Sequence, residues 1–186
     1  QLYNYPYQLN IIILFCLKYK MPSLTPDINY IDNYFPIEFA QHLQKKIKKL
    51  QSFSLNSFSL DKKEPPFWFM EFTKNDHFKD EIDFIQKYIP QKIIRGYVNG
   101  QTFGQYGSFH DDDGDMTYLY YPCSDWSIED GGGTEFLLKD DNTLVVYPKF
   151  NRMCIFNSKI SHRATPNRSF TKLRMTLAFK TENNTI

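Results

Sequence analysis

From Lys92 onward, short β-prone segments alternate with clusters of turn-forming residues, and this pattern constrains the fold more than any other feature. Branched and aromatic residues favour strands, whereas the Gly, Asn, Asp and Pro residues between the segments favour turns. No helical periodicity occurs between the segments. The pattern therefore predicts an antiparallel sandwich or barrel. Six expected strands span residues 93–98, 116–121, 134–138, 143–148, 152–157 and 173–179.

The residues before Lys92 predict two helices and one strand. Residues 36–52 carry an apolar stripe at helical spacing, with Pro36 suited to the first turn, and residues 67–73 resemble a strand. Residues 75–90 carry a second stripe that Pro90 ends. The stripes are Phe39, Leu43, Ile47 and Leu50, then Phe78, Ile82, Ile85 and Ile89, and Asn75 or Asp76 can cap the second helix. We expect a mainly β, α+β fold with a jelly-roll core and N-terminal helices.

The chain length predicts one domain. Its 186 residues, 41% of them hydrophobic and 17% aromatic, can bury a sizeable core, which excludes disorder. The apolar run LNIIILFCL (9–17) has no basic residues before it and no small-residue cleavage site after it, and is short for a bilayer span. We interpret residues 1–20 as an extension outside the native domain, with a membrane anchor as the alternative. The single domain is then 21–186, with a helical part (21–91) and a β-core (92–186).

Charge and cysteine content exclude some classes of protein. The net charge is +1, and the only basic run is KKIKK (45–49), so bulk electrostatics do not indicate a nucleic-acid partner. Cys16, Cys123 and Cys154 lie far apart without a CxxC pair, so neither a disulfide framework nor a cysteine zinc site is indicated. Reduced cysteines predict a cytoplasmic or other intracellular location, without a membrane partner.

The acidic stretch GSFHDDDGD (107–115) raises three hypotheses: a solvated loop, a calcium loop, or half of a metal site. A calcium loop of the EF-hand type needs Gly at its sixth position and Glu at its twelfth. With Asp111 first, Met116 and Pro122 take those positions, and with Gly114 sixth, a phenylalanine comes first. The sequence also lacks a dinucleotide fingerprint, a P-loop and a GxSxG elbow, so those classes are not supported.

The metal hypothesis gains support from a second histidine. His110 and Asp112 are two residues apart and project to one side of an extended segment. An HxD pair by itself is more typical of an acidic surface loop. His162, some fifty residues later and just past an expected strand, supplies the second imidazole. Two histidines and one carboxylate form a facial set that leaves coordination positions open for substrates.

Arg174 is the expected anion-binding residue of the same site. Strand alternation puts it on one face of its strand with Thr176 and Ala178. A dicarboxylic keto acid that chelates a metal at one end needs a buried cation at the other, and the guanidinium fork suits a carboxylate. Lys172 shares the strand parity of Arg174 and is a rival, while Arg168 lies in a turn and should be solvated.

The order of these motifs resembles the iron(II)/2-oxoglutarate-dependent dioxygenases, in particular their prolyl 4-hydroxylase-like branch. The resemblance covers nearly half of the chain, from about Arg95 to Lys180. It implies a double-stranded β-helix core. The matching motifs are His110 with Asp112, TYLYY (117–121), GGGTEF (131–136), PKFNRMCIF (148–156), His162 and RMT (174–176).

The resemblance also implies roles. It makes His110, Asp112 and His162 the iron ligands and catalytic centre, and Arg174 the partner of the distal 2-oxoglutarate carboxylate. Four further residues would assist in binding 2-oxoglutarate: Thr176, Tyr121, Thr134 and Tyr97. It implies iron(II), 2-oxoglutarate and O2, with ascorbate as an optional further cofactor.

The implied reaction is hydroxylation coupled to oxidative decarboxylation of 2-oxoglutarate, with a prolyl side chain of a protein or peptide as the first expected substrate. Three alternatives stay open at this stage. They are oxidative demethylation of a nucleic acid base, hydroxylation of a free amino acid, and a non-catalytic binding module on the same fold. The sequence does not indicate the oligomeric state.

Overall fold

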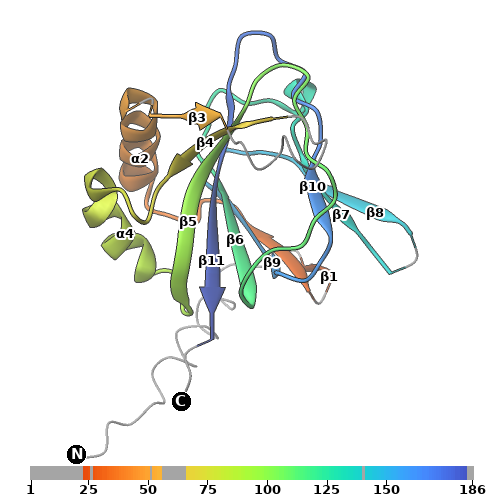
Figure 1. Ribbon diagram of the computed structural model, residues 1–186, viewed down its shortest axis with the longest axis horizontal. Helices are drawn as coiled ribbons and strands as arrows, with labels where there is room; N and C mark the ends of the chain where they lie inside the picture. The colour runs from red at the N-terminus through yellow and green to blue at the C-terminus, as the bar shows by residue number, and fades with distance from the viewer. Residues whose placement is uncertain (1–22, 26, 51, 56–65, 140, 184–186) are drawn as a thin grey trace, which may run out of the picture.

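The computed structural model describes residues 23–25, 27–50, 52–55, 66–139 and 141–183 (Figure 1). Within these residues the strands form two antiparallel sheets, one ordered β1-β2-β9-β6-β11-β5-β4-β3 and a smaller one ordered β10-β7-β8. The strands are β1 Ser23–Thr25, β2 Ile28–Ile31, β3 Ser54–Leu55, β4 Trp68–Glu71, β5 Lys92–Gln101, β6 Met116–Tyr121, β7 Thr134–Leu137, β8 Thr143–Val146, β9 Arg152–Asn157, β10 His162–Ala164 and β11 Arg174–Glu182. The mainly β jelly-roll prediction is confirmed.

Two helices cover one face of the larger sheet, as the sequence predicts. Helix α2 spans Ile37–Leu50, and helix α4 spans Lys79–Gln86. The 3-10 turn η1 (Asp76–Phe78) precedes α4, and a second one, η2, spans Ile128–Asp130. Figure 1 shows α2 and α4 on one side of β5 and β11, with the smaller sheet on the other side.

Strand β11 divides the apolar interior into two cores. Leu177 and Phe179 point to the helical side, where they pack with residues of α2 and α4. Ala178 points the other way and packs with Phe136 of β7, between the two sheets. Side chains on β11 therefore alternate between the two faces of the sheet, as predicted. The side chains of Arg174 and Thr176 point into the space between the sheets.

Several elements differ from the prediction. The strands β1, β2, β3 and β10, of two to four residues each, were not expected. Strand β2 nevertheless pairs with β9 and extends the main sheet. The second helix is shorter than 75–90. Asn75 caps the 3-10 turn η1 before it by accepting a hydrogen bond from the His77 amide, whereas α4 itself has no side-chain cap.

The N-terminal extension (1–20), with its apolar run 9–17, lies outside the described residues, so the domain boundaries stay a prediction. None of the helices described here is long and apolar enough to cross a membrane.

Candidate metal centre

The two sequence-predicted histidines meet across a short antiparallel bridge. The amide of His110 donates to the carbonyl of His162 at 3.0 Å, and the reverse bond is 2.9 Å. The segment before β6 is thereby held against β10, and the two ring centroids lie 4.5 Å apart. Asp112, two residues further on, is buried, while Asp111 and Asp113 are exposed, as strand-like alternation requires.

The three side chains converge with the geometry of a ligand set. One potential ligand atom from each of His110, Asp112 and His162 lies within 4.8 Å of the others. The Nδ1 atoms of the two rings lie 2.9 Å from the Ser108 carbonyl and 2.8 Å from the Ile160 carbonyl. A carbonyl can only accept, so each Nδ1 carries the proton and each Nε2 lone pair is left for a ligand.

The Asp112 carboxylate is surrounded by polar groups, of which Thr117 and Lys180 are donors. Thr117 Oγ1 donates to its Oδ2 at 2.8 Å, and His162 Nε2 lies 3.3 Å from the same oxygen. The Lys180 ammonium also contacts Oδ2. Burial alone would raise the pKa of this carboxyl, but the His162 contact and the Lys180 charge outweigh it and hold the pKa well below its usual range. Asp112 is therefore ionised, as a metal ligand must be.

The histidine at the mouth of the site favours its neutral form. Burial, and then the neighbouring ring of His162, lower the pKa of His110. A neutral imidazole is the form that binds a metal. Half of the His110 side chain is nevertheless exposed, so it borders the entrance of the site.

Arg174 is buried at the other end of the site. Its side chain donates to the Gly132 carbonyl, to Gln101 Oε1 at 2.8 Å and to Thr134 Oγ1 at 3.4 Å. These acceptors are all neutral, and among the described residues Arg174 has no acidic partner within ion-pair distance. A buried guanidinium without a counter-charge is costly, so this end of the site suits an anionic group.

The rival cations face elsewhere. Lys172 forms an ion pair with Asp130 at 2.7 Å, and Arg168 is exposed. The structure therefore places Arg174, and neither Lys172 nor Arg168, inside the site.

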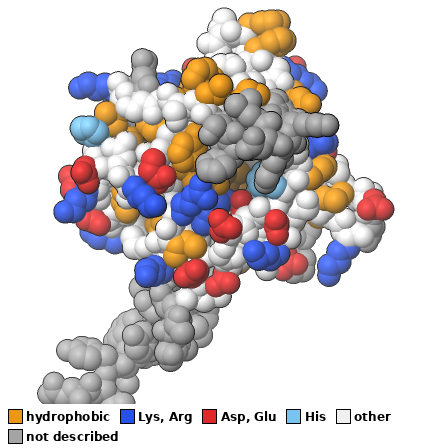
Figure 2. Space-filling view, viewed as in Figure 1, with side chains coloured by type: hydrophobic (Ala, Val, Ile, Leu, Met, Phe, Trp, Pro, Cys, Tyr) orange, Lys and Arg blue, Asp and Glu red, His pale blue; other side chains and the backbone are white. Residues whose placement is uncertain are grey.

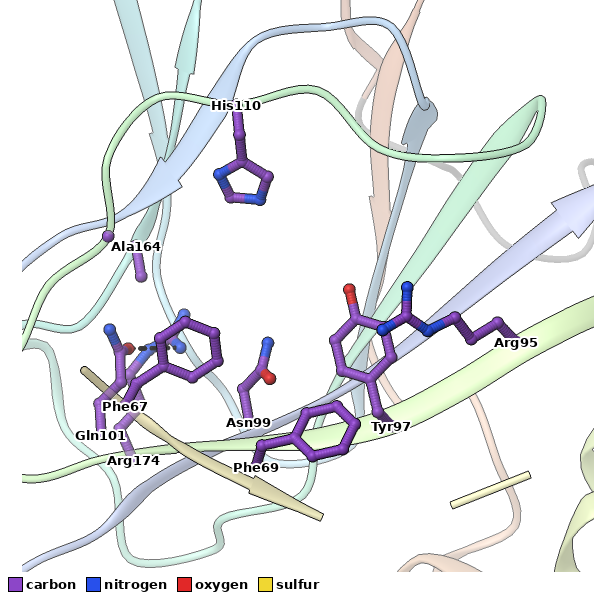
Figure 3. Close-up of a pocket in the computed structure, with 10 residues that line it drawn as sticks. Phe67, Phe69, Arg95, Tyr97, Asn99, Gln101, His110, Ala164 and Arg174 are labelled. Atoms are coloured by element: carbon purple, nitrogen blue, oxygen red, sulfur yellow. Dashed lines mark hydrogen bonds between the residues drawn. The ribbon is translucent and has the colours of Figure 1, made fainter. Parts of the chain in front are cut away.

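Two adjoining cavities connect the triad to Arg174. The inner one, about 60 Å³, lies between the sheets and reaches Asp112, His162 and Lys180. The outer one, about 140 Å³, is bordered by aromatic side chains of the β4 segment and β5. Figure 3 shows His110 facing Asn99, Tyr97 and the rings of Phe67 and Phe69 across the outer cavity. Both cavities share five lining residues: Tyr97, Asn99, His110, Ala164 and Arg174.

Residues 68–180 match the model of the 2OG-Fe(II) oxygenase superfamily, which is well over half of the chain. The chain belongs to the 2OG-Fe(II) oxygenase superfamily. It is therefore an oxidoreductase, and the family implies iron(II) and 2-oxoglutarate. No curated protein sequence matches the chain.

Solved structures of two prolyl hydroxylases and of one further oxidoreductase share the fold. A prolyl-4-hydroxylase of Pseudomonas putida aligns with a TM-score of 0.68 at 11% identity, covering 94% of this chain and 99% of that one. A prolyl hydroxylase of Trichoplax adhaerens, in complex with a peptide fragment of the hypoxia inducible factor oxygen degradation domain, gives 0.66 at 16% identity and covers 95% and 92%. A 2OG-Fe(II) oxygenase family oxidoreductase of Burkholderia pseudomallei gives 0.70 at 10% identity and covers 96% and 92%.

The residues present fit what this oxygenase family binds. Two imidazoles and an ionised carboxylate suit iron(II), and a buried arginine without an acidic partner suits the far carboxylate of a dicarboxylic co-substrate. Gly132 makes room for this arginine, because a Cβ there would lie 2.7 Å from Arg174 Cδ. Glycine at this position therefore permits the close approach of the arginine side chain to the backbone.

The four assisting residues of the sequence prediction lie at different depths. Tyr97, Thr134 and Thr176 line the inner cavity. Tyr121 is buried behind it, where its hydroxyl lies 2.7 Å from Thr134 Oγ1. Their contact with 2-oxoglutarate stays a prediction, with Tyr121 one hydrogen bond removed from the cavity.

Several residues that line these cavities were not predicted as site residues from the sequence, and three of them are polar groups beside the predicted ones. Gln101 holds the guanidinium of Arg174, and Lys180 contacts Asp112. Asn99 lines both cavities, and its Oδ1 is buried without a hydrogen-bond partner among the described residues. Lys180 could have been found, because it continues the parity of Arg174, Thr176 and Ala178 along β11.

Proposed function

We propose that the protein is an iron(II)- and 2-oxoglutarate-dependent hydroxylase that acts on a prolyl side chain of a protein or peptide. The observation that carries the proposal is the continuous cavity with two histidines and a carboxylate at one end and an unpaired buried arginine at the other. This arrangement suits a metal-chelating keto acid with a second, distal carboxylate.

In this proposal the protein supplies binding and orientation. His110, Asp112 and His162 hold the iron, and the Arg174 guanidinium binds the distal carboxylate of 2-oxoglutarate. When bound, iron and co-substrate supply the oxidising power for the reaction with O2. Thr134 and Thr176 border the path of the co-substrate, and the apolar core between the sheets limits the access of water to it.

The outer cavity supports a peptide substrate. Phe67, Phe69 and Tyr97 form an aromatic wall that suits a neutral, apolar ring such as that of proline. Two of the similar structures are prolyl hydroxylases, and one of them holds a peptide. The same cavity is also lined by the small residues Gly107 and Ala164, which take up little of its volume.

Surface charge supports the choice of a peptide over a nucleic acid. On the face seen in Figure 2, basic and acidic side chains are interspersed and do not form a continuous basic stripe. Arg95, at the rim of the outer cavity, lies 3.6 Å from Asp113, so part of its charge is compensated. A nucleic-acid groove would need uncompensated cations along its length.

The test is succinate formation from 2-oxoglutarate with iron(II), measured by mass spectrometry against three panels: proline-containing peptides, methylated oligonucleotides and free amino acids. We expect substrate-dependent succinate, and a mass increase of one oxygen, with a proline peptide. If only oligonucleotides or free amino acids stimulated succinate formation, the peptide assignment would be overturned. An absence of turnover with every panel, in protein that binds iron and 2-oxoglutarate, would favour the non-catalytic module.

A further inference from the structure

A lysine is buried beside the candidate metal ligands. Lys180 is 3% exposed, and its ammonium contacts Oδ2 of Asp112. The same ammonium lies 3.5 Å from Thr117 Oγ1 and 5.5 Å from the centroid of the Tyr97 ring. Neither the triad nor the anchor for 2-oxoglutarate requires this residue.

The sheet leaves Lys180 no alternative position. It pairs with Thr117 of β6 on one side and with Arg95 of β5 on the other, in the middle of the larger sheet. Its parity on β11 is that of Arg174, so both cations face the space between the sheets. At about 3.3 Å per residue, six residues separate their Cα atoms by roughly 20 Å, and both side chains line the inner cavity.

Two donors therefore occupy one oxygen of Asp112 and leave the other. Oδ2 contacts Lys180 and accepts a hydrogen bond from Thr117 at 2.8 Å, whereas Oδ1 faces His110 Nε2 at 3.9 Å. A carboxylate held in this way presents its second oxygen toward the His110 side of the ligand set. The buried charge also has a fixed place, close to where a divalent cation would bind.

We propose that Lys180 is a positioning residue that makes metal binding depend on the anionic co-substrate. Its fixed positive charge opposes a bound divalent cation and favours the dianion that follows. The metal alone then binds weakly, and metal with 2-oxoglutarate binds strongly. This inference rests on the proposed triad.

The electrostatic effect should exceed the orienting effect. Charges a few ångströms apart in a protein interior interact strongly enough to change an affinity by about tenfold or more. Loss of rotamer freedom by one aspartate side chain accounts for only about a few-fold. Removal of the lysine charge should therefore tighten the binding of metal alone, whereas loss of a residue that only supports the fold could only weaken it.

The experiment measures the Kd for Mn(II) by calorimetry, with and without 2-oxoglutarate, in the parent, in three Lys180 variants and in one control variant. Lys180→Met removes charge and hydrogen bond, Lys180→Gln keeps a donor without the charge, and Lys180→Arg keeps the charge. Lys172→Met is the matched control, because Lys172 lies two residues before β11 and pairs with Asp130 outside the cavities.

We expect Lys180→Met and Lys180→Gln to bind Mn(II) alone about tenfold or more tightly than the parent. The enhancement by 2-oxoglutarate should fall by a similar factor, and Lys180→Arg and Lys172→Met should resemble the parent. If Lys180→Met does not fold, Lys180→Gln still tests the effect of removing the ammonium charge. Unchanged or weaker binding of Mn(II) alone in a folded Lys180→Gln would overturn this inference and leave the triad intact. Absence of Mn(II) binding in the parent would overturn the triad, and this inference with it.

Discussion

At the residue scale, the site depends on a few side chains whose other polar atoms already have hydrogen-bond partners. Both imidazoles use Nδ1 for a backbone carbonyl, so Nε2 is the atom that each offers. Arg174 could be chosen from the sequence by parity and spacing, but Lys172 could not be excluded, because Asp130, its actual partner, is 42 residues away in the chain. Such distant pairings are not visible in a single sequence.

Substitutions in the triad should separate binding from stability. His110→Ala and His162→Ala should lower Mn(II) affinity by more than about 100-fold, because each removes a direct ligand. The half-exposed position of His110 predicts an unchanged melting temperature for His110→Ala. Asp112→Ala should also cost about 3–5 kcal/mol of unfolding free energy, since it leaves Lys180 buried without a counter-charge.

Calorimetric titration of each variant measures its Mn(II) affinity, and urea unfolding measures its free energy of unfolding. If His162→Ala bound Mn(II) as tightly as the parent, the triad assignment would be wrong. Equal stability of Asp112→Ala and His110→Ala would contradict the pairing of Asp112 with Lys180.

A glycine pair tests the close approach of Arg174 to the backbone. Gly132 and Gly104 both have positive φ, 65° and 76°, but a Cβ at Gly104 would meet nothing within 4 Å. Gly104→Ala should therefore cost only the conformational strain, about 1–2 kcal/mol. Gly132→Ala should cost more, and should also weaken 2-oxoglutarate binding, because its Cβ displaces Arg174. Equal effects of the two substitutions on unfolding and on 2-oxoglutarate affinity would show that Gly132 is not needed for this approach.

At the element scale, the strands that turn-forming residues flank on both sides could be predicted, whereas β10 could not. Strands β6 and β9 begin and end where the sequence predicts, because turn-forming residues flank each of them. Strand β10 has three residues, and it forms because its backbone pairs with Phe136 and its neighbours on β7. The site depends on β10, because β10 carries His162. The position of His162 therefore results from the pairing of β10 with β7 and not from a local sequence pattern.

The contact between α2 and α4 should depend on pH through Glu81. This side chain is buried and accepts hydrogen bonds from Lys46 and His42, each at 2.7 Å. Burial alone would raise the pKa of Glu81, but these two partners outweigh it and lower the pKa. A lowered pKa in the folded state gives stability that is present above the unfolded pKa of about 4.3 and is lost as the pH falls through the folded value.

Glu81→Gln should therefore cost about 1–3 kcal/mol at pH 7, and the difference from the parent should shrink as the pH falls below about 4. Urea unfolding of both proteins between pH 3 and pH 7 measures this, with the exposed Glu38→Gln of the same helix pair as the control. A difference that grew toward acid would contradict the assignment.

At the scale of the whole molecule, the two cores explain why the site can be both buried and open. The helices close one face of the larger sheet, and the smaller sheet closes only part of the other. Residues of β5 and β11 line both cavities, and Thr134 and His162 of the smaller sheet also line the inner one. The order of motifs in the sequence predicted this architecture, whereas the outer cavity depends on which loops meet, which local patterns do not encode.

A shortened chain tests the proposed domain boundary. A protein that starts at Met21 should match the full chain in melting temperature and 2-oxoglutarate affinity, because the domain is proposed to span 21–186. Differential scanning calorimetry of the two proteins measures the first quantity. A loss of several degrees would show that residues before Met21 stabilise the fold.

The central claim is that one cavity binds a metal at one end and a distal carboxylate at the other. Anaerobic calorimetric titration of 2-oxoglutarate into the iron(II)-loaded protein tests both ends together. We predict that 2-oxoglutarate binds one-to-one and only when the metal is present. Arg174→Ala should weaken the affinity for 2-oxoglutarate by about 30-fold to several thousand-fold, since a buried charge-assisted contact is worth roughly 2–5 kcal/mol.

In the same titration Arg174→Lys should recover part of the loss, because lysine keeps the charge but not the fork. Lys172→Ala and Arg168→Ala should bind like the parent, since both side chains lie outside the cavities. Unchanged 2-oxoglutarate affinity in Arg174→Ala, or equal affinity with and without iron, would contradict the account.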